Sequence, residues 1–314
     1  MLPYIFHEHS FVGEITKYVF YSTSCYYLCK VFVKKNSVQA IVDYLKEGLV
    51  ALYPLAEAEA IIAVLFEHYH SWNRVDINLK SEEQLSESEL LKLHHALKEL
   101  KEFRPIQYVL GVANFYNLKL MVNEHVLIPR QETEELVDLI ITEVDNGKSI
   151  IDIGSGSGCI SVSCKKSKNL SAVYAVDIDP HALQLVSDNA KQYNLEIETI
   201  RMDVLNWSDH ERKYDVVVSN PPYVLEKEKA SMHQNVLRYE PELALFVQDH
   251  EPIVFYEHIA DFSVKHLNTD GIIYFEVNEK FADEVADCLK FRNFKKIRVI
   301  KDLNGKDRIV TAIV

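Results

Sequence analysis

Positive charge is scarce in this chain. Lys and Arg total 34 against 47 Asp and Glu, so the 314 residues carry a formal net charge of −13. Proteins that bind nucleic acids through a broad surface need basic side chains to neutralise phosphates. The charge balance therefore predicts no direct nucleic-acid readout and favours small molecules or proteins as partners. Long apolar runs are also missing: no stretch reaches the roughly 18 consecutive apolar residues that a membrane span requires.

Cysteine is scarce too, and the five cysteines are scattered without the paired spacing of metal ligands. In a chain of this length, such usage is typical of a reducing compartment, so we expect a cytoplasmic protein without a disulfide framework or a metal. Cys25 and Cys29 lie within residues 1–35, where Ser, Thr and aromatic residues interrupt the apolar ones. That stretch is too polar for a signal-peptide core, and we assign it only as an extension of unknown role.

Helical spacing begins after Ser37. Apolar residues recur three or four positions apart over three successive segments, and Ser37 and Ser86 precede the first and the third in positions suited to N-caps. A small helical bundle over residues 36–103 is therefore predicted. Its four histidines, at positions 68, 70, 94 and 95, are better explained by packing or a solvated face than by ligation, which indicates a domain that recognises a partner or substrate.

A linker over residues 104–130 is predicted next, because Pro105 breaks the third helix. Its two apolar runs, residues 113–122 and 126–128, predict the strands of a β-hairpin whose turn is formed by residues 123–125. A helix should follow, with Thr133 or an earlier residue as its N-cap.

Glycines gather at one place in the second half of the chain. A buried strand runs into Gly154, Gly156 and Gly158, with Asp152 two positions before the first glycine, and a helix follows. Glycine permits positive φ and close approach of a ligand to the backbone, while the helix N-terminus offers free N–H groups. A dinucleotide fingerprint would need its third glycine at position 159, where Cys159 stands, so a different nucleotide-type cofactor is favoured.

Polar residues end the neighbouring strands. The strand over residues 172–176 ends in Asp177, whose carboxylate can accept hydrogen bonds from both hydroxyls of a ribose. The apolar run that begins at Tyr214 ends in Asn220-Pro-Pro-Tyr223, where the two prolines hold the backbone extended. In open α/β sheets, ligands bind at the carboxyl ends of the strands, so we expect these residues to line one site.

These motifs resemble those of class I S-adenosylmethionine-dependent methyltransferases. In that class, the Asn-Pro-Pro-Tyr loop is associated with methylation of planar nitrogens, either glutamine side-chain amides or the exocyclic amine of adenine. Over roughly residues 37–314, the chain more specifically resembles the release factor glutamine N5-methyltransferase family, also called the HemK/PrmC family. Further segments similar to that family are Arg104–Gly111, Leu127–Glu134, Arg238–Pro241 and Asp302–Val310.

The resemblance implies a fold and a cofactor. The fold is α/β, a Rossmann-like sheet that is mostly parallel with an antiparallel last strand, formed by residues 131–314 and preceded by the bundle and the hairpin linker. The cofactor is S-adenosyl-L-methionine as methyl donor, with the glycine loop at its methionine end, Asp177 at its ribose, and Asp203 and Val204 by its adenine. The implied cofactor-binding residues are Asp152, Gly154, Ser155, Gly156, Ser157, Gly158, Asp177, Asp203, Val204 and Asn220.

The resemblance also implies a substrate, the glutamine of the Gly-Gly-Gln motif in peptide chain release factors, bound by Asn220, Pro221, Pro222 and Tyr223. A glutamine amide is a poor nucleophile, because its nitrogen lone pair is delocalised into the carbonyl group. As a mechanistic hypothesis, the Asn220 side-chain oxygen and the Pro221 carbonyl each accept one N–H of that amide, while Tyr223 packs against it and excludes water. These three residues are the candidate catalytic residues, and no general base is required.

Other functions remain open at this point. A methyltransferase acting on a ribosomal protein glutamine would use the same chemistry. A DNA adenine N6-methyltransferase is disfavoured by the acidic charge, and a non-catalytic cofactor-binding module by the intact motifs. We expect a monomer. Glu240 and Glu276 are interpreted as acids that shape the substrate pocket, support the structure or face solvent.

Overall fold

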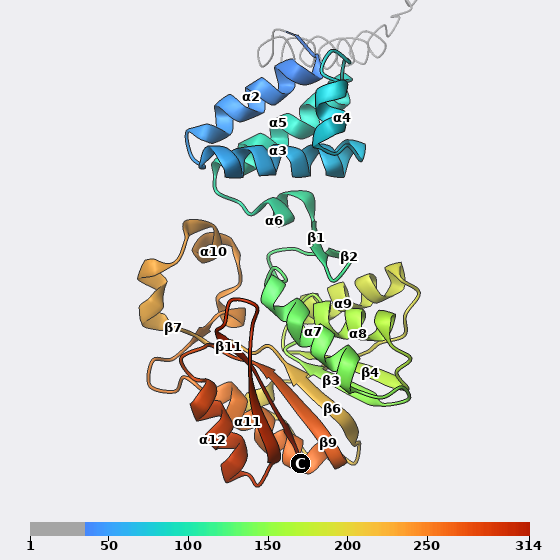
Figure 1. The fold of residues 1–314 in the computed structure, drawn as a ribbon, viewed down its shortest axis with the longest axis vertical. Helices are drawn as coiled ribbons and strands as arrows, with labels where there is room; N and C mark the ends of the chain where they lie inside the picture. The colour runs from blue at the N-terminus through green and yellow to red at the C-terminus, as the bar shows by residue number, and fades with distance from the viewer. Residues whose placement is uncertain (1–34) are drawn as a thin grey trace, which may run out of the picture. The chain divides into compact units, whose positions relative to one another are not determined.

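The computed structural model describes residues 35–314, so residues 1–34 of the predicted extension, with Cys25 and Cys29, lie outside the described residues. Within the described residues, the chain divides into two compact units, residues 35–110 and residues 111–314, which are coloured from blue to green and from green to red in Figure 1. We describe each unit by itself.

The first unit is helical. Its described part contains α2 (Val38–Val50), α3 (Leu55–His70), α4 (Arg74–Leu79), α5 (Glu87–Lys101) and α6 (Ile106–Leu110). Both predicted N-caps are confirmed, since Ser37 accepts a hydrogen bond from the Ala40 N–H and Ser86 forms a reciprocal capping box with Glu89. The apolar faces of α2, α3 and α5 meet in one core that includes Leu45, Leu49, Leu65, Phe66, Leu93 and Leu97.

Two short helices complete this unit. The six residues of α4 follow Asn73, which forms a capping box with Asp76, and the five residues of α6 follow Pro105. Neither helix is long enough to show helical periodicity, so only the capping residue and the proline signal them in the sequence.

The predicted hairpin is present, but its turn lies elsewhere. β1 (Val112–Phe115) pairs antiparallel with β2 (Leu118–Met121), and the turn between them is Tyr116-Asn117. Both turn residues have positive φ, 46° and 59°, as a two-residue turn compatible with strand twist requires. The prediction of one strand over residues 113–122 and a turn at residues 123–125 was therefore wrong, because both strands and the turn lie within residues 112–121, almost entirely inside the first apolar run.

The second unit is built on one seven-stranded sheet in the order β10-β11-β9-β6-β3-β4-β5. β11 pairs antiparallel with both of its neighbours, whereas the other adjacent pairs are parallel. This arrangement confirms the predicted mostly parallel, Rossmann-like sheet with an antiparallel last strand. The strands are β3 (Ser149–Ile153), β4 (Ala172–Asp177), β5 (Glu198–Arg201), β6 (Tyr214–Ser219), β9 (Leu267–Glu276), β10 (Lys295–Lys301) and β11 (Asp307–Ile313).

Helices cover both faces of this sheet (Figure 1). Side chains alternate along each strand, so Ile150 and Val216 pack in one core while Ile151 and Val217 pack in the other. The helices α7 (Gln131–Glu143) and α8 (Cys159–Ser167) belong to the first core, and α9 (Pro180–Gln192) packs against α8, β4 and β5. The helices α11 (Val254–His266) and α12 (Ala282–Phe291) belong to the second core.

The parallel pairing brings three loops to one edge of the sheet. β6 and β4 both pair with β3, so the segments that begin at Gly154, Ile178 and Asn220 leave the sheet side by side. The Ser219 hydroxyl donates to the Ile153 carbonyl at 2.6 Å and holds the ends of β6 and β3 together. A longer connection follows β6 and contains β7 (Val224–Leu225), η2 (Glu226–Ser231), α10 (Gln234–Tyr239), η3 (Glu242–Ala244) and β8 (Phe246–Val247).

Within residues 35–314, every helix is too short or too polar to span a membrane.

A buried amide joins the hairpin, the glycine loop and α9. Asn189 on α9 is fully buried; its Nδ2 donates to the carbonyls of Met121 and Ser157, and its Oδ1 accepts the Met121 N–H. We expect Asn189→Ala to lower the free energy of unfolding by about 2 to 4 kcal/mol, because backbone groups would stay buried without partners. Urea denaturation followed by circular dichroism measures this change.

Gln184→Ala is the matched control for that variant, since Gln184 is exposed on the same helix. The control should change stability by less than about 0.5 kcal/mol. Equal losses in the two variants would contradict the role given to Asn189.

Candidate active site

The glycine loop between β3 and α8 adopts a conformation that favours glycine. Gly154, Gly156 and Gly158 have φ values of 75°, 53° and 78°. A Cβ added to Gly154 or Gly156 would meet no atom within 4 Å, whereas one added to Gly158 would lie 3.1 Å from Val186 on α9. The first two glycines therefore border open space where a ligand can approach the backbone, and the third allows helix packing.

Asp177 lies against this loop, as the sequence predicts. Its Oδ2 accepts the Gly156 N–H at 2.9 Å and its Oδ1 accepts the Asp179 N–H at 3.0 Å. Burial raises the pKa of Asp177, although these backbone hydrogen bonds oppose the shift. The carboxylate is thus held at the carboxyl end of β4, beside the ribose position expected for a nucleotide-type cofactor.

Asp152 is fully buried behind the same loop. Its Oδ2 accepts the Ser161 N–H at 3.1 Å. Among the described residues, neither Asp152 Oδ1 nor the buried Ser155 Oγ has a hydrogen-bond partner. Buried polar atoms are ordinarily paired, so these two unpaired atoms, one two residues before Gly154 and one within the glycine loop, fit a polar ligand such as S-adenosylmethionine.

Other predicted cofactor residues lie nearby. The Ser157 carbonyl accepts the Asn189 amide, so this residue helps to hold the loop. Met202, at the end of β5, donates its N–H to the Asp177 carbonyl, and this bond places the following Asp203 beside the β4 end. Asp203 accepts hydrogen bonds from the Leu205 N–H and the Asn206 amide, so its carboxylate caps the turn η1 (Val204–Asn206). Val204 packs partly buried against the second core.

Asn220 begins the loop after β6. It is half-buried, Pro221 is buried, and Pro222 and Tyr223 are half-buried. Asn220 Nδ2 donates to Thr133 Oγ1 at 3.2 Å, and the Tyr223 hydroxyl donates to Glu276 Oε1 at 3.3 Å. Two of the predicted catalytic side chains are therefore held by residues of α7 and β9.

Thr133 and Glu276 complete a cluster that the sequence does not reveal as a unit. The Thr133 hydroxyl donates to Glu276 Oε2 at 2.6 Å, and their exposed fractions are both 1%. Thr133 or an earlier residue was expected as the N-cap of α7; the N-cap is the earlier residue Arg130, whose side chain makes no capping hydrogen bond, and Thr133 lies inside the helix. Burial raises the pKa of Glu276 to about 7, against the effects of the Thr133 hydrogen bond and the Arg308 charge.

Glu240 supports the same end of α7. It is 5% exposed, and its carboxylate accepts from Arg130 Nη2 at 2.7 Å and from the Ile128 N–H at 3.1 Å. Neither Glu240 nor Glu276 faces solvent, so the interpretation of solvated acids is excluded for both. The segments Leu127–Glu134 and Arg238–Pro241, noted for their resemblance, are thus in direct contact.

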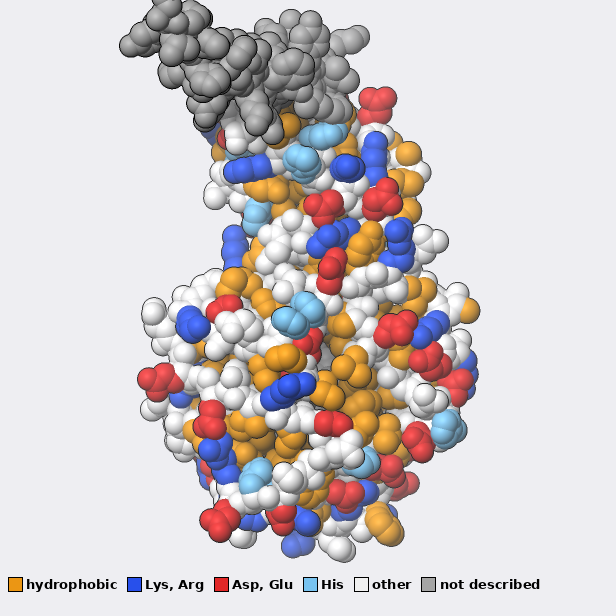
Figure 2. All heavy atoms as spheres, turned by 180° about the vertical axis from the view of Figure 1, so that it is seen from behind, with side chains coloured by type: hydrophobic (Ala, Val, Ile, Leu, Met, Phe, Trp, Pro, Cys, Tyr) orange, Lys and Arg blue, Asp and Glu red, His pale blue; other side chains and the backbone are white. Residues whose placement is uncertain are grey.

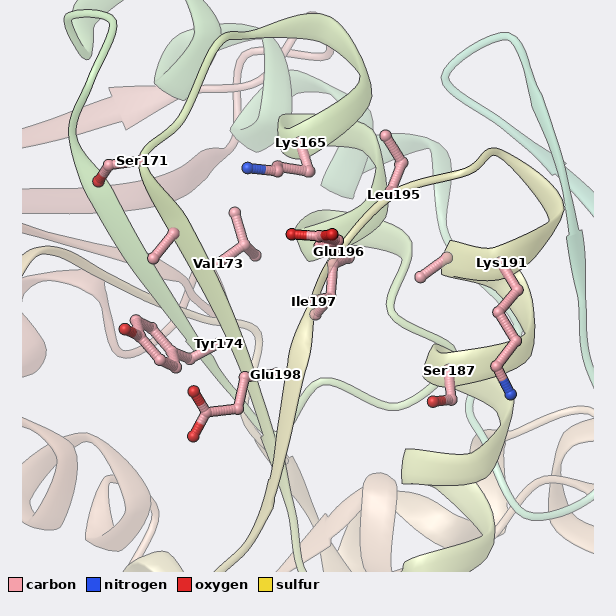
Figure 3. A pocket seen from close by; sticks show the side chains of 12 residues that line it. Lys165, Ser171, Val173, Tyr174, Ser187, Lys191, Leu195, Glu196, Ile197 and Glu198 are labelled. Atoms are coloured by element: carbon pink, nitrogen blue, oxygen red, sulfur yellow. The ribbon is translucent and has the colours of Figure 1, made fainter.

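A hollow of about 400 Å³ lies away from these residues. It is lined by the amino-terminal halves of β4 and β5 and the ends of α8 and α9, with Lys165, Tyr174, Glu196 and Glu198 around it (Figure 3). None of its lining residues belongs to the candidate site, which occupies the opposite, carboxyl edge of the sheet.

One group within the described residues has the composition of a metal site. His125, Asp179 and His181 bring their ligand atoms within 4.8 Å of one another, and the two imidazoles stack with centroids 4.3 Å apart. Both His residues are exposed. The Asp179 carboxylate already accepts a hydrogen bond from the backbone N–H of His181 and contacts His125 Nδ1. Hydrogen bonding explains this cluster, and we assign it no metal.

Acidic and basic side chains are interspersed over the face shown in Figure 2. The described side chains on that face form no continuous basic surface.

Comparison with known proteins identifies the family. The PrmC N-terminal domain matches residues 43–111, and the methyltransferase small domain matches residues 131–243. A release factor glutamine methyltransferase of Flavobacterium psychrophilum is 39% identical over 269 residues, covering 84% of this chain and 94% of the relative. One from Bacteroides thetaiotaomicron is 38% identical over 273 residues, covering 87% and 98%.

A solved methyltransferase structure from Pyrococcus furiosus matches 62% of this chain and 88% of the solved chain, at 16% identity and a TM-score of 0.47. This likeness is too distant to bear on activity. The sequence relatives match along nearly their whole length and include both the helical and the sheet units. The chain belongs to the release factor glutamine methyltransferase family.

Proposed function

We propose that this protein methylates the side-chain amide nitrogen of the glutamine in the Gly-Gly-Gln motif of peptide chain release factors. The observation that carries the proposal is the placement of Asn220 at the carboxyl end of β6, beside the glycine loop of β3. Asn220 Nδ2 donates to Thr133, and Oδ1, which has no hydrogen-bond partner within residues 35–314, can accept a substrate N–H. The adjacent Pro221 carbonyl provides a second acceptor at the same strand end.

S-adenosylmethionine is the methyl donor, and it supplies an electrophilic methyl group on a sulfonium. We assign its methionine end to residues 154–158 with Asp152, its ribose to Asp177, and its adenine to Asp203 and Val204. Asp152 Oδ1 and Ser155 Oγ, unpartnered among the described residues, are the polar atoms that such a ligand would engage. Asn220, on the neighbouring strand end, would also border the methyl group.

Two acceptors are sufficient to prepare a glutamine amide. Asn220 Oδ1 and the Pro221 carbonyl would each accept one N–H, which turns the face of the nitrogen toward the methyl donor. They would also stabilise the positive charge that develops on nitrogen during transfer. Positioning of this kind can lower the barrier by several kcal/mol. Tyr223, with Pro222 beside it, would exclude water from the amide, and the proton can leave after transfer without a dedicated base.

The relatives' names point to release factors as the protein substrate. We propose that residues 36–103 recognise this partner, that residues 104–130 link them to the catalytic domain of residues 131–314, and that the enzyme works as a cytoplasmic monomer. A DNA target is disfavoured by the net charge of −13. A ribosomal protein glutamine is the closer rival, because its chemistry would be identical.

The direct test is incubation with labelled S-adenosylmethionine and, separately, release factor, ribosomal proteins or DNA. We expect label in the release factor alone, with mass spectrometry placing one methyl group on the Gly-Gly-Gln peptide. Labelling of ribosomal protein or DNA instead would overturn the substrate assignment.

Asn220→Ala tests the acceptor role. Loss of one preorganised hydrogen-bonding group at a reacting centre typically lowers kcat by about 100- to 1,000-fold, and we expect a decrease of that order. Single-turnover kinetics would measure it, and calorimetry with S-adenosylhomocysteine should show cofactor affinity changed only slightly.

Asn146→Ala is the control, because Asn146 is exposed before β3, at the amino edge of the sheet. It should retain full turnover. Near-normal turnover of Asn220→Ala, with the cofactor still bound, would refute the assigned role.

Asp152 predicts a pH dependence of stability. Burial raises the pKa of Asp152 from its ordinary 3.8 to about 7. The folded protein then retains a proton that the unfolded chain releases, so stability from this group falls as pH rises from about 4 to about 7, by at most about 4 kcal/mol. Asp152→Asn should therefore lose less stability between pH 5 and pH 8 in thermal unfolding of the free protein, while binding S-adenosylhomocysteine more weakly.

Glu276 titrates in the same range, so a smaller pH effect should persist in Asp152→Asn. Exposed Asp145 provides the control, since Asp145→Asn should keep the wild-type profile. An unchanged profile in Asp152→Asn would show that Asp152 is ionised throughout.

A further inference from the structure

Three elements meet at one buried hydroxyl. Thr133 lies in the first turn of α7, Glu276 ends β9, and Asn220 follows β6. Thr133 Oγ1 is 2.6 Å from Glu276 Oε2 and 3.2 Å from Asn220 Nδ2. Thr133 is not needed as a helix cap, so its burial here calls for another explanation.

The direction of these hydrogen bonds follows from the number of available protons. A hydroxyl has one proton to donate, and an ionised carboxylate can only accept. The Thr133 hydroxyl therefore donates its hydrogen bond to Glu276, and Thr133 can then only accept a hydrogen bond from Asn220. Asn220 must turn its NH₂ group to Thr133, which directs Oδ1 away from Thr133, toward the position assigned to the substrate amide.

Tyr223 reinforces this order. Its hydroxyl donates to the second oxygen of Glu276 at 3.3 Å. One carboxylate thus accepts two hydrogen bonds, one from Thr133 and one from Tyr223, the last residue of the Asn-Pro-Pro-Tyr loop. Both ends of that loop are held by Glu276, directly at Tyr223 and through Thr133 at Asn220.

We propose that Glu276 and Thr133 are positioning residues for methyl transfer, which act by fixing the orientation of the Asn220 amide. This inference rests on the proposed function, because the glutamine amide is what the oriented oxygen would accept from. An ionised Glu276 selects the productive orientation. A protonated Glu276 can donate a hydrogen bond to Thr133. The Thr133 hydroxyl can then donate to Asn220 Oδ1, so the Asn220 amide can also adopt the flipped orientation.

The surroundings of Glu276 place this change near neutral pH. Burial is the largest effect and raises its pKa to about 7; the Glu132 charge acts in the same direction, and Arg308 opposes it. The other titratable groups that interact with it are Tyr223, Tyr256 on α11 and Cys159 on α8. Turnover limited by the Asn220 orientation should therefore rise with pH through about 7.

Thr133→Val removes the hydroxyl while keeping the shape of the side chain. We expect kcat to fall about 10- to 100-fold, the effect of one hydrogen bond, with KM for S-adenosylmethionine changed by less than about threefold. Thr133→Ser restores the hydroxyl and should recover turnover to within about threefold of wild type. Thr142→Val, at an exposed position on the same helix, is the control and should match wild type.

Glu276→Gln supplies a readout that a merely structural role would not change. Its carboxamide does not titrate, so the rise of kcat through about pH 7 should disappear. If thermal unfolding shows that Thr133→Val is not folded, the turnover of Thr133→Ser and the pH profile of Glu276→Gln still test the positioning role.

Wild-type turnover in Thr133→Val, or a rise near pH 7 that persists in Glu276→Gln, would overturn the inference while leaving the proposed function intact. Failure of the wild-type protein itself to methylate any glutamine substrate would instead overturn the proposed function.

Discussion

The hydrogen bond from Thr133 to Glu276 organises the candidate site. It joins the start of α7 to the end of β9 inside the protein, and the same hydroxyl accepts the Asn220 amide from the end of β6. A buried carboxylate is costly unless it is well supplied with donors, and Thr133 and Tyr223 are the donors here. The arrangement that orients the loop is therefore also the one that makes the buried acid tolerable.

The sheet explains why these groups meet. Parallel pairing of β4 and β6 with β3 brings the carboxyl ends of all three strands to one edge, with the glycine loop between Asp177 and Asn220. The site nevertheless has an energetic cost. Burial raises the pKa of both Asp152 and Glu276 to about 7, so the free protein holds two acids in surroundings that disfavour their charge. Such shifts are typical of functional sites, where stability is sacrificed for chemistry.

Much of this was predictable from the sequence, because the glycine loop, Asp177 and Asn220 each follow a strongly apolar strand. The α/β sheet and the family resemblance were confirmed. The hairpin turn was misplaced, since Tyr116-Asn117 lies inside an apolar run and its positive φ values have no glycine to signal them. The sequence left the N-cap of α7 open between Thr133 and an earlier residue, because a threonine near a helix start resembles a cap, and the N-cap is Arg130. The true partner of Thr133 is 143 positions away, a separation that local patterns do not reveal.

The central claim is that Asn220 Oδ1 and the Pro221 carbonyl together hold a glutamine amide nitrogen. A crystal structure with S-adenosylhomocysteine and a peptide containing Gly-Gly-Gln tests it most directly. The account predicts the glutamine amide nitrogen within hydrogen-bond distance of both oxygens, with Asn220 Nδ2 still on Thr133. A glutamine bound through its carbonyl oxygen to Asn220 Nδ2, or held away from the end of β6, would contradict it.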